Sequence, residues 1–283
     1  MIPSAFEYAR ATSLDEALAL LVKHGEGSKI LAGGHSLVPM MKLRLAEPSV
    51  LIDIGGIAAL SGIAFDGKRF VIGATTKHAA LAASDELRRH APVLWEAANQ
   101  LGDPQVRNRG TVGGACANGD PSCDYAAVMF ALDATFGVVG SGSRRDDPAG
   151  VFQRGMFETS LRPGELLASM SFDAAPHSAY QKYHHPASHY AMVGVAVVLE
   201  LEAGAIASAR VGVTGVGEHA YRAGGVEKAL VGVRPSDQSA VAAACAGAAA
   251  GVEVRSDTEA SATYRAAMTD VFTARAVLAA AER

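Results

Sequence analysis

Two glycine-rich segments carry the residue types that can hold a phosphate group. The first, Ala-Gly-Gly-His-Ser at residues 32–36, directly follows a short apolar run that predicts a strand. Glycines after a strand let the backbone turn tightly and present several N–H groups to one anion, and the His35 and Ser36 side chains add further donors. A plain strand-to-helix turn is the alternative interpretation of the same residues.

The second segment reads Thr-Val-Gly-Gly-Ala at residues 111–115 and continues into Asn-Gly-Asp-Pro-Ser-Cys-Asp at 118–124. It is predicted as a second glycine turn, so the two segments together could bind both ends of a dinucleotide. Asp124 could accept a hydrogen bond from a ribose hydroxyl or cap the helix that follows. The glycine spacings typical of a Rossmann domain and of a P-loop are missing, so neither fold is expected.

The surrounding pattern predicts helices and strands that must position these segments. Ser13 and Glu16 have the spacing of a capping box, and the apolar residues that follow predict a helix ending at Gly25. Residues 140–147 are predicted as an exposed loop or hairpin tip. Further strands are predicted at 29–32, 50–54, 69–74 and 135–139, and further helices at 85–101 and 125–132.

From about residue 176 the pattern changes. Valine-rich runs at 192–202 and 206–216 predict an antiparallel hairpin. Helices are then predicted at 225–231, 239–250 and 259–281. Because helices that follow a block of strands indicate an α+β domain, a boundary is placed near residue 176.

Composition narrows the class of protein. The chain has 283 residues, of which 49% are hydrophobic and 19% charged, which predicts two domains or three small ones. The net charge of 25 − 29 = −4 offers no global cationic surface, so no nucleic-acid partner is expected. No run of 18 apolar residues and no secretory signal are present, so we expect no transmembrane segment and a cytoplasmic location.

The number and spacing of the cysteines limit the disulfides and metal clusters that this chain could hold. Cys116, Cys123 and Cys245 are too few for a disulfide scaffold. An iron–sulfur cluster takes four Cys, or two Cys and two His. Six residues separate Cys116 from Cys123, and Cys245 lies in an Ala-rich helix pattern, so no cluster is expected on this chain alone. The alternative for all three is a small buried hydrophobe.

The histidines at 184, 185 and 189 invite a metal interpretation. His185 and His189 are four residues apart, but Pro186 opposes a helix through both. No Cys or carboxylate cluster lies near them in the sequence, so no metal site is expected. Histidines that face solvent would change charge near neutral pH.

The sequence resembles the FAD-binding medium subunits of the molybdenum hydroxylases, and within them those of the carbon monoxide dehydrogenases. The resemblance rests on AGGHSLVPMMKLR at 32–44 together with RNRGTVGG at 107–114. It is supported by IGA at 72–74 with His78, NGDP at 118–121, PGELL at 163–167 and YRAAM at 264–268. It extends from about residue 1 to residue 280.

The resemblance implies an α+β fold. Two FAD-holding α/β subdomains of the PCMH type would occupy residues 1–57 and 58–176. A C-terminal flavoprotein domain of a small antiparallel sheet and helices would occupy residues 177–283.

The resemblance also implies the residues that bind FAD, with no catalytic residue and no metal ligand in this chain. Both glycine segments would hold the pyrophosphate. Lys182 would approach the flavin edge, Leu167 the ring system or the adenine, and Tyr190 the isoalloxazine. The implied FAD-binding residues are Ala32, Gly33, Gly34, His35, Ser36, Leu37, Thr111, Val112, Gly113, Gly114, Ala115, Asn118, Cys123, Asp124, Leu167, Lys182 and Tyr190.

Two departures from the family pattern stand near these residues. Ala115 replaces an Asn that relatives commonly carry, which removes one side-chain hydrogen bond. Residues 184–189 read His-His-Pro-Ala-Ser-His where relatives usually carry basic residues and an acidic one, and His189 takes the acidic position. The reactivity of the flavin with acceptors is therefore expected to differ from that in relatives.

The implied function is electron transfer within a complex. A small subunit with two [2Fe–2S] clusters and a large subunit with the molybdenum cofactor would be the partners, in a dimer of heterotrimers. Electrons would pass from the clusters through FAD to an external acceptor such as a quinone. The complex could sit in the cytoplasm or peripherally at the inner face of the membrane.

Two other functions stay open. One is a self-sufficient FAD-dependent oxidoreductase with its own substrate pocket, using Tyr190 or His189 for proton transfer. The other is a flavin-free assembly protein that has kept the fold. The substrate of the complex, whether carbon monoxide, an aldehyde or an N-heterocycle, would bind on the molybdenum subunit and cannot be inferred from this chain.

Overall fold

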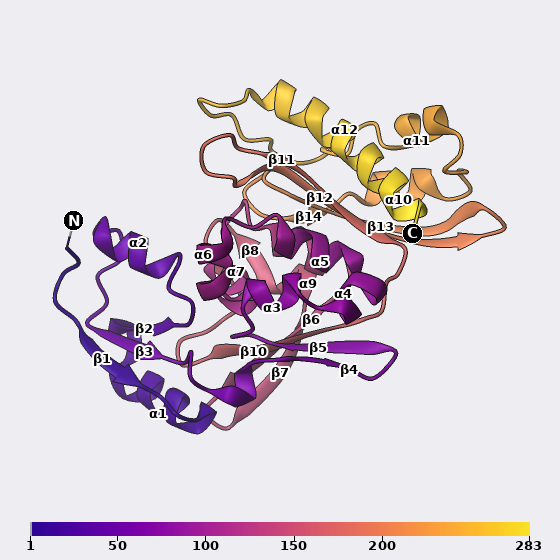
Figure 1. Ribbon diagram of the computed structural model, residues 1–283. Helices are drawn as coiled ribbons and strands as arrows, with labels where there is room; N and C mark the ends of the chain where they lie inside the picture. The colour runs from indigo at the N-terminus through magenta and orange to yellow at the C-terminus, as the bar shows by residue number, and fades with distance from the viewer. Residues whose placement is uncertain (1) are drawn as a thin grey trace.

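Three main β-sheets follow one another along the chain, and helices cover them (Figure 1). The computed structural model describes residues 2–283. The sheets use strands within residues 7–53, 63–173 and 178–222, and a small two-stranded hairpin lies within the second of these ranges. The predicted subdomain limits at 57 and 176 stay a prediction. The hydrophobic core around the second sheet also includes Tyr180, Ala196 and Val198 of the third sheet, so this core does not mark a boundary at 176.

The first sheet is parallel, in the order β1-β3-β2. Its elements are β1 (Glu7–Arg10), α1 (Leu14–His24), η1 (Gly25–Gly27), β2 (Ser28–Leu31), α2 (Leu37–Lys42) and β3 (Val50–Asp53). The predicted cap of α1 is confirmed, since the Ser13 side chain accepts a hydrogen bond from the Glu16 N–H. Glu16 does not return this bond to Ser13, and its carboxylate accepts from the N–H and hydroxyl of Thr12.

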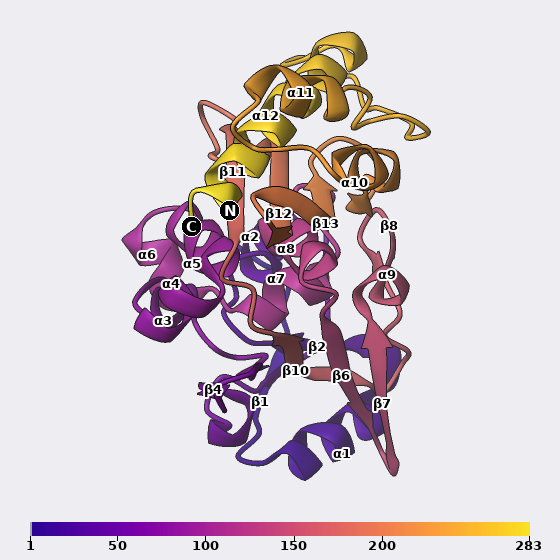
Figure 2. The same cartoon turned by 90° about the vertical axis from the view of Figure 1, so that its right-hand side faces the viewer.

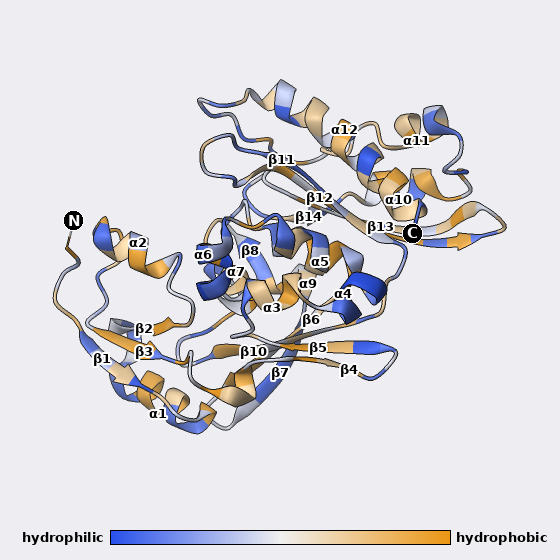
Figure 3. Cartoon of the chain, viewed as in Figure 1, coloured by the Kyte–Doolittle hydropathy of each residue, from blue (hydrophilic) through white to orange (hydrophobic). Residues whose placement is uncertain are grey.

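The second sheet is antiparallel, in the order β4-β5-β10-β6-β7. Its strands are β4 (Ile63–Phe65), β5 (Arg69–Gly73), β6 (Thr135–Gly140), β7 (Ser143–Pro148) and β10 (Leu166–Asp173). Of the loop or hairpin tip predicted at 140–147, only residues 141–142 form the turn between β6 and β7. The strand β7 is hydrophilic and lies at the sheet edge (Figure 3). The sequence analysis did not predict the central strand β10.

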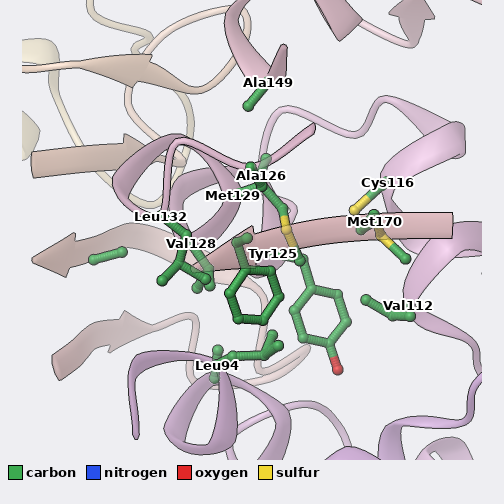
Figure 4. Packing of buried hydrophobic residues seen from close by; sticks show 14 of the residues in the cluster. Leu94, Val112, Cys116, Tyr125, Ala126, Val128, Met129, Leu132, Ala149 and Met170 are labelled. Carbon is green, nitrogen blue, oxygen red and sulfur yellow. The ribbon is translucent and has the colours of Figure 1, made fainter. Parts of the chain in front are cut away.

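Short helices connect and cover the second sheet. They are η2 (Ala58–Leu60), α3 (His78–Ala82), α4 (Asp85–His90), α5 (Pro92–Asn99), α6 (Pro104–Arg109), α7 (Val112–Asn118), α8 (Asp124–Ala131) and α9 (Ala149–Phe152), followed by the hairpin of β8 (Gln153–Gly155) and β9 (Glu158–Thr159). Figure 4 shows Tyr125 of α8 packed among Leu94, Val112 and Met170, which are all fully buried. The α8 helix therefore lies inside the core.

The prediction of one long helix at residues 85–101 is wrong. The structure has two helices there, α4 and α5, separated at Ala91. Proline has no N–H to continue the hydrogen-bond ladder, and it pushes the preceding residue out of the helical region. Ala91 accordingly has φ −152° and ψ 60°, and Pro92 starts the new helix.

The third sheet is antiparallel, in the order β11-β12-β13-β14. Its elements are β11 (Ser178–His184), β12 (Ala191–Glu202), β13 (Ala205–Thr214), β14 (Tyr221–Arg222), α10 (Gly224–Leu230), α11 (Gln238–Ala244) and α12 (Ala262–Ala281). The predicted hairpin is confirmed as β12 and β13. The helix predicted at 239–250 ends early, at Ala244, and the last helix begins only after its cap residue Ser261.

Both faces of the third sheet are covered. One face packs against α5 and α8 of the preceding unit, and the other against α10 and α12 (Figures 1 and 2). Gly212 of β13 approaches α8 so closely that a Cβ atom there would lie 2.0 Å from the carbonyl oxygen of Ala127. This close approach fixes the third sheet on α8.

We therefore expect Gly212→Ala to destabilise the protein. The added methyl group must push β13 away from α8, which should lower the free energy of unfolding by about 3 kcal/mol. Gly225→Ala is a matched control, because a Cβ atom there meets nothing within 4 Å, and its effect should stay within about 1 kcal/mol. Urea unfolding of both variants measures the difference, and equal stabilities would contradict the proposed steric role of Gly212.

Candidate functional site

The structure brings the two glycine segments into direct backbone contact. A Cβ atom on Gly33 would lie 2.4 Å from the carbonyl oxygen of Arg109 and 2.7 Å from the Cα of Gly110. A Cβ atom on Gly114 would lie 3.9 Å from the Cβ of Ala32. Any side chain at Gly33 would therefore push the segments apart.

The first segment leaves its backbone donors unused. Among residues 2–283, no partner accepts a hydrogen bond from the N–H groups of residues 33–37. Gly34 has φ +78°, in the left-handed region that glycine tolerates. Left-handed turns of this kind can point successive N–H groups into one concavity that suits an anion. Residues 33–37 therefore have the donors that the sequence predicted.

The second segment differs from the glycine turn that was predicted. It forms the start of α7, and the Thr111 side chain caps this helix by accepting from the Gly114 N–H at 3.2 Å. The N–H groups of Val112 and Gly113 donate to backbone carbonyls after β5, at 3.0 and 2.9 Å. The prediction overlooked that Thr111 is a good N-cap residue. In this segment the glycines allow close packing, and most of the backbone donors are already used.

A buried histidine lies beneath the second segment. The Nδ1 atom of His78 is 3.0 Å from the Tyr125 hydroxyl oxygen, and a Cβ atom on Gly110 would lie 2.5 Å from His78 Nε2. Burial lowers the pKa of His78 to about 4, and the nearby charges of His35 and Arg107 act in the same direction. His78 is therefore a neutral side chain at neutral pH.

A buried ion pair lies at the start of α8. Lys182 Nζ is 2.8 Å from Asp124 Oδ1, and the two residues are only 6% and 2% exposed. Tyr180 donates its hydroxyl hydrogen to the same oxygen at 2.5 Å. The Lys182 ammonium makes no well-directed hydrogen bond to any residue in the described chain. Asp124 thus holds Lys182, while Cys123 occupies the N-cap position of α8.

Tyr180 is the site residue that the sequence analysis missed. It lies on β11, a strand that was not predicted, two residues before Lys182 and on the same face. Residues 178–184 show no regular alternation of apolar and polar residues, so the sequence carries no clear signal for this strand.

The remaining predicted residues fall into two groups. Tyr190 is 52% exposed, and Asp120, Cys123 and Asp124 lie close enough to add to the effect of burial in raising its pKa. Asn118 and Ala115 are partly exposed on α7. Val112 and Leu167 instead lie in the hydrophobic core. Contact of Leu167 with a cofactor therefore stays a prediction.

The loop that carries Tyr190 is tied down by a histidine. His185 Nδ1 accepts hydrogen bonds from the N–H groups of Ala187 and Ser188 at 3.2 and 3.1 Å. His185 Nε2 lies 3.6 Å from a carboxylate oxygen of Glu259.

Within residues 2–283, no group of three or more His, Cys, Asp or Glu side chains is placed to hold a metal ion. No helix in the same range is long and apolar enough to cross a membrane.

Comparisons with known proteins identify the family. Residues 4–172 match the family described as FAD binding domain in molybdopterin dehydrogenase, and residues 178–280 match the CO dehydrogenase flavoprotein C-terminal domain. The carbon monoxide dehydrogenase medium chain of Afipia carboxidovorans is 40% identical over 280 residues, covering 98% of this chain and 97% of the relative.

Solved structures agree with this match. A carbon monoxide dehydrogenase structure from Hydrogenophaga pseudoflava has a TM-score of 0.94 at 41% identity, covering 99% of this chain and 98% of that one. Quinoline 2-oxidoreductase from Pseudomonas putida 86 has a TM-score of 0.94 at 30% identity, covering 100% and 99%. The α+β fold class expected from the sequence is confirmed.

The chain belongs to the FAD-binding medium subunits of the molybdenum hydroxylases. Within this family it is similar to the medium chains of carbon monoxide dehydrogenases. The residues present fit FAD, the cofactor of the family. The unused N–H groups at 33–37 suit a pyrophosphate.

The low pKa of His78 makes stability depend on pH. The ring takes up a proton near pH 6.5 in the unfolded chain but only near pH 4 in the folded one, so acid favours unfolding between these values. Lowering the pH from 7 to 5 should cost the folded state about 2 kcal/mol through this residue. Urea unfolding at both pH values should show a loss smaller by this amount in His78→Gln. An unchanged pH dependence in the variant would contradict the assignment.

Proposed function

We propose that this chain is the FAD-binding electron-transfer subunit of a molybdenum hydroxylase complex. The observation that carries the proposal is the pairing of the two glycine segments, in which the first keeps the N–H groups of residues 33–37 free. Backbone amides in such an arrangement are well suited to the pyrophosphate of a dinucleotide.

Most of the predicted residues then have a role toward the cofactor. Residues 33–37 donate to the pyrophosphate, with His35 and Ser36 beside them, while the glycines at 113–114 let α7 pack closely. Asn118, Cys123 and Asp124 line the cofactor, and Ala115 offers no side-chain hydrogen bond. Lys182 provides a positive charge at the flavin edge, and Tyr190 covers the ring system.

FAD, when bound, supplies the reversible uptake and release of electrons, and the chain supplies placement and electrostatics. We assign no catalytic residue to this chain. The His78 ring supports the second segment as a neutral side chain and moves no proton.

The partners belong to the proposal as well. We infer a small subunit with two [2Fe–2S] clusters and a large subunit with the molybdenum cofactor, in a dimer of heterotrimers in the cytoplasm. The three cysteines support a separate cluster subunit, because among the described residues they are not gathered with other side chains that could ligate a metal. Electrons would pass from the clusters through FAD to an external acceptor. The named relatives act on carbon monoxide and on quinoline, so the substrate stays open.

Co-purification tests the complex. The chain is expressed together with the proteins encoded beside its gene, and FAD, iron and molybdenum are assayed across one gel-filtration peak. We expect all three in the same peak. FAD alone on an isolated chain that a small substrate reduces would replace this proposal with the self-sufficient oxidoreductase.

The pyrophosphate assignment is tested by Gly33→Val and Gly114→Val. The first side chain must displace the Arg109 carbonyl, and the second must displace the Thr111 hydroxyl, from which a Cβ atom would be 2.7 Å away. Both variants should lose most of their FAD, measured per chain after gel filtration, with circular dichroism as a check of folding. Gly225→Ala is the control and should keep its FAD. Normal FAD content in both valine variants would overturn the assignment.

A further inference from the structure

The backbone at Gly110 is in close contact with a histidine ring and with the first glycine segment. A Cβ atom on Gly110 would lie 2.5 Å from His78 Nε2. The Cα of Gly110 in turn lies 2.7 Å from the place that a Cβ atom on Gly33 would take. Gly110 therefore connects the buried ring to the segment that carries the free N–H groups.

Hydrogen bonds hold Gly110 in this place. The N–H of His78 donates to the carbonyl oxygen of Gly110 at 3.1 Å, and the N–H of Gly110 donates to the carbonyl oxygen of Val106 at 2.8 Å. His78 thus contacts Gly110 through its backbone as well as through its ring. A shift of either residue must move the other.

Tyr125 fixes the orientation of the ring. Its hydroxyl oxygen is 3.0 Å from His78 Nδ1 and has no other hydrogen-bond partner within residues 2–283. Burial raises the pKa of Tyr125 well above its usual value, so the hydroxyl keeps its hydrogen at neutral pH. Because the ring is neutral there, the hydroxyl donates to Nδ1, and the ring hydrogen lies on Nε2, the atom beside Gly110.

The first segment lies within reach of this pair. The charge of His35 acts on the His78 ring, so the ring lies near the run of residues 33–37. Gly33, which begins that run, is packed against the carbonyl of Arg109 and the Cα of Gly110. Any movement of the backbone at 109–110 therefore changes the position of the free N–H groups.

We propose that His78 and Tyr125 form a positioning pair that holds the backbone of residues 109–110 against Gly33 and so sets how tightly residues 33–37 bind a pyrophosphate group. This inference rests on the proposed function. His78 acts through Gly110, and Tyr125 acts through His78, without a contact to the ligand. Donors that are held in place before binding give higher affinity, because less ordering is needed when the ligand binds.

A size exchange tests the contact between the ring and Gly110. Each full-length variant is freed of FAD, and its Kd for FAD is measured at neutral pH by flavin fluorescence. His78→Ala leaves the backbone unsupported and Gly110→Ala pushes it away from the ring, so each should weaken FAD binding about tenfold. In the double variant the new methyl group fills part of the vacated space, and the Kd should return to within about threefold of the wild type.

Inorganic pyrophosphate shows whether the effect lies at the phosphate donors. Its inhibition constant, measured by displacement of FAD, should change by the same factors as the Kd for FAD.

Tyr125→Phe tests the other member of the pair. It removes only the hydroxyl group and should weaken FAD binding about threefold. Tyr183→Phe is the matched control and should bind FAD like the wild type, because the Tyr183 hydroxyl oxygen lies 3.3 Å from that of Tyr264 on α12. Circular dichroism checks the folding of every variant, and Tyr125→Phe decides the question if His78→Ala does not fold.

The outcomes separate the two proposals. A wild-type chain that binds neither FAD nor pyrophosphate would overturn the proposed function. A chain that binds both, with unchanged affinities in the folded His78→Ala and Gly110→Ala variants, would overturn only the present inference. Losses that add up in the double variant would also overturn it, because they exclude an action through this contact. Equal effects of Tyr125→Phe and Tyr183→Phe would remove the role of Tyr125.

Discussion

A backbone contact between Gly33 and Arg109 is the constraint on which the site depends. The first segment ends β2 of the parallel sheet, and the second is anchored to the end of β5 by the hydrogen bonds of Val112 and Gly113. Neither sheet alone presents both segments. The absence of a side chain at Gly33 therefore sets the spacing between two units of the fold, and the free N–H groups at 33–37 lie beside the contact.

A second close approach brings in the third unit. Gly212 lets β13 lie directly on α8, which carries Asp124 at its first turn, while β11 of the same sheet carries Lys182. Free backbone N–H groups, a carboxylate and an ammonium thus come from three different sheets or their helices. Each sheet with its helices contributes one kind of polar group, and close backbone approaches at glycines fix the three units relative to one another.

The sequence allowed the parts with a local signal to be predicted. The Ser13 cap, the β12–β13 hairpin and both glycine segments were recognised because their signals lie within a few residues. The break at Pro92 was also local but was overlooked. Tyr180 is different, because its role comes from the pairing of β11 with β12 and from the position of α8, far away in the sequence. No local pattern reports such a contact.

The Lys182–Asp124 pair is hard to explain as a device for stability. Removing two charges from water costs several kcal/mol for each ion, and their mutual attraction repays this only with further hydrogen bonds. Tyr180 gives one such bond to the carboxylate, but the ammonium lacks well-directed partners within the described chain. An apolar pair of similar size would pack at least as well. The pair is therefore a local cost in stability, which the packing of α8 against β12 and β13 must offset.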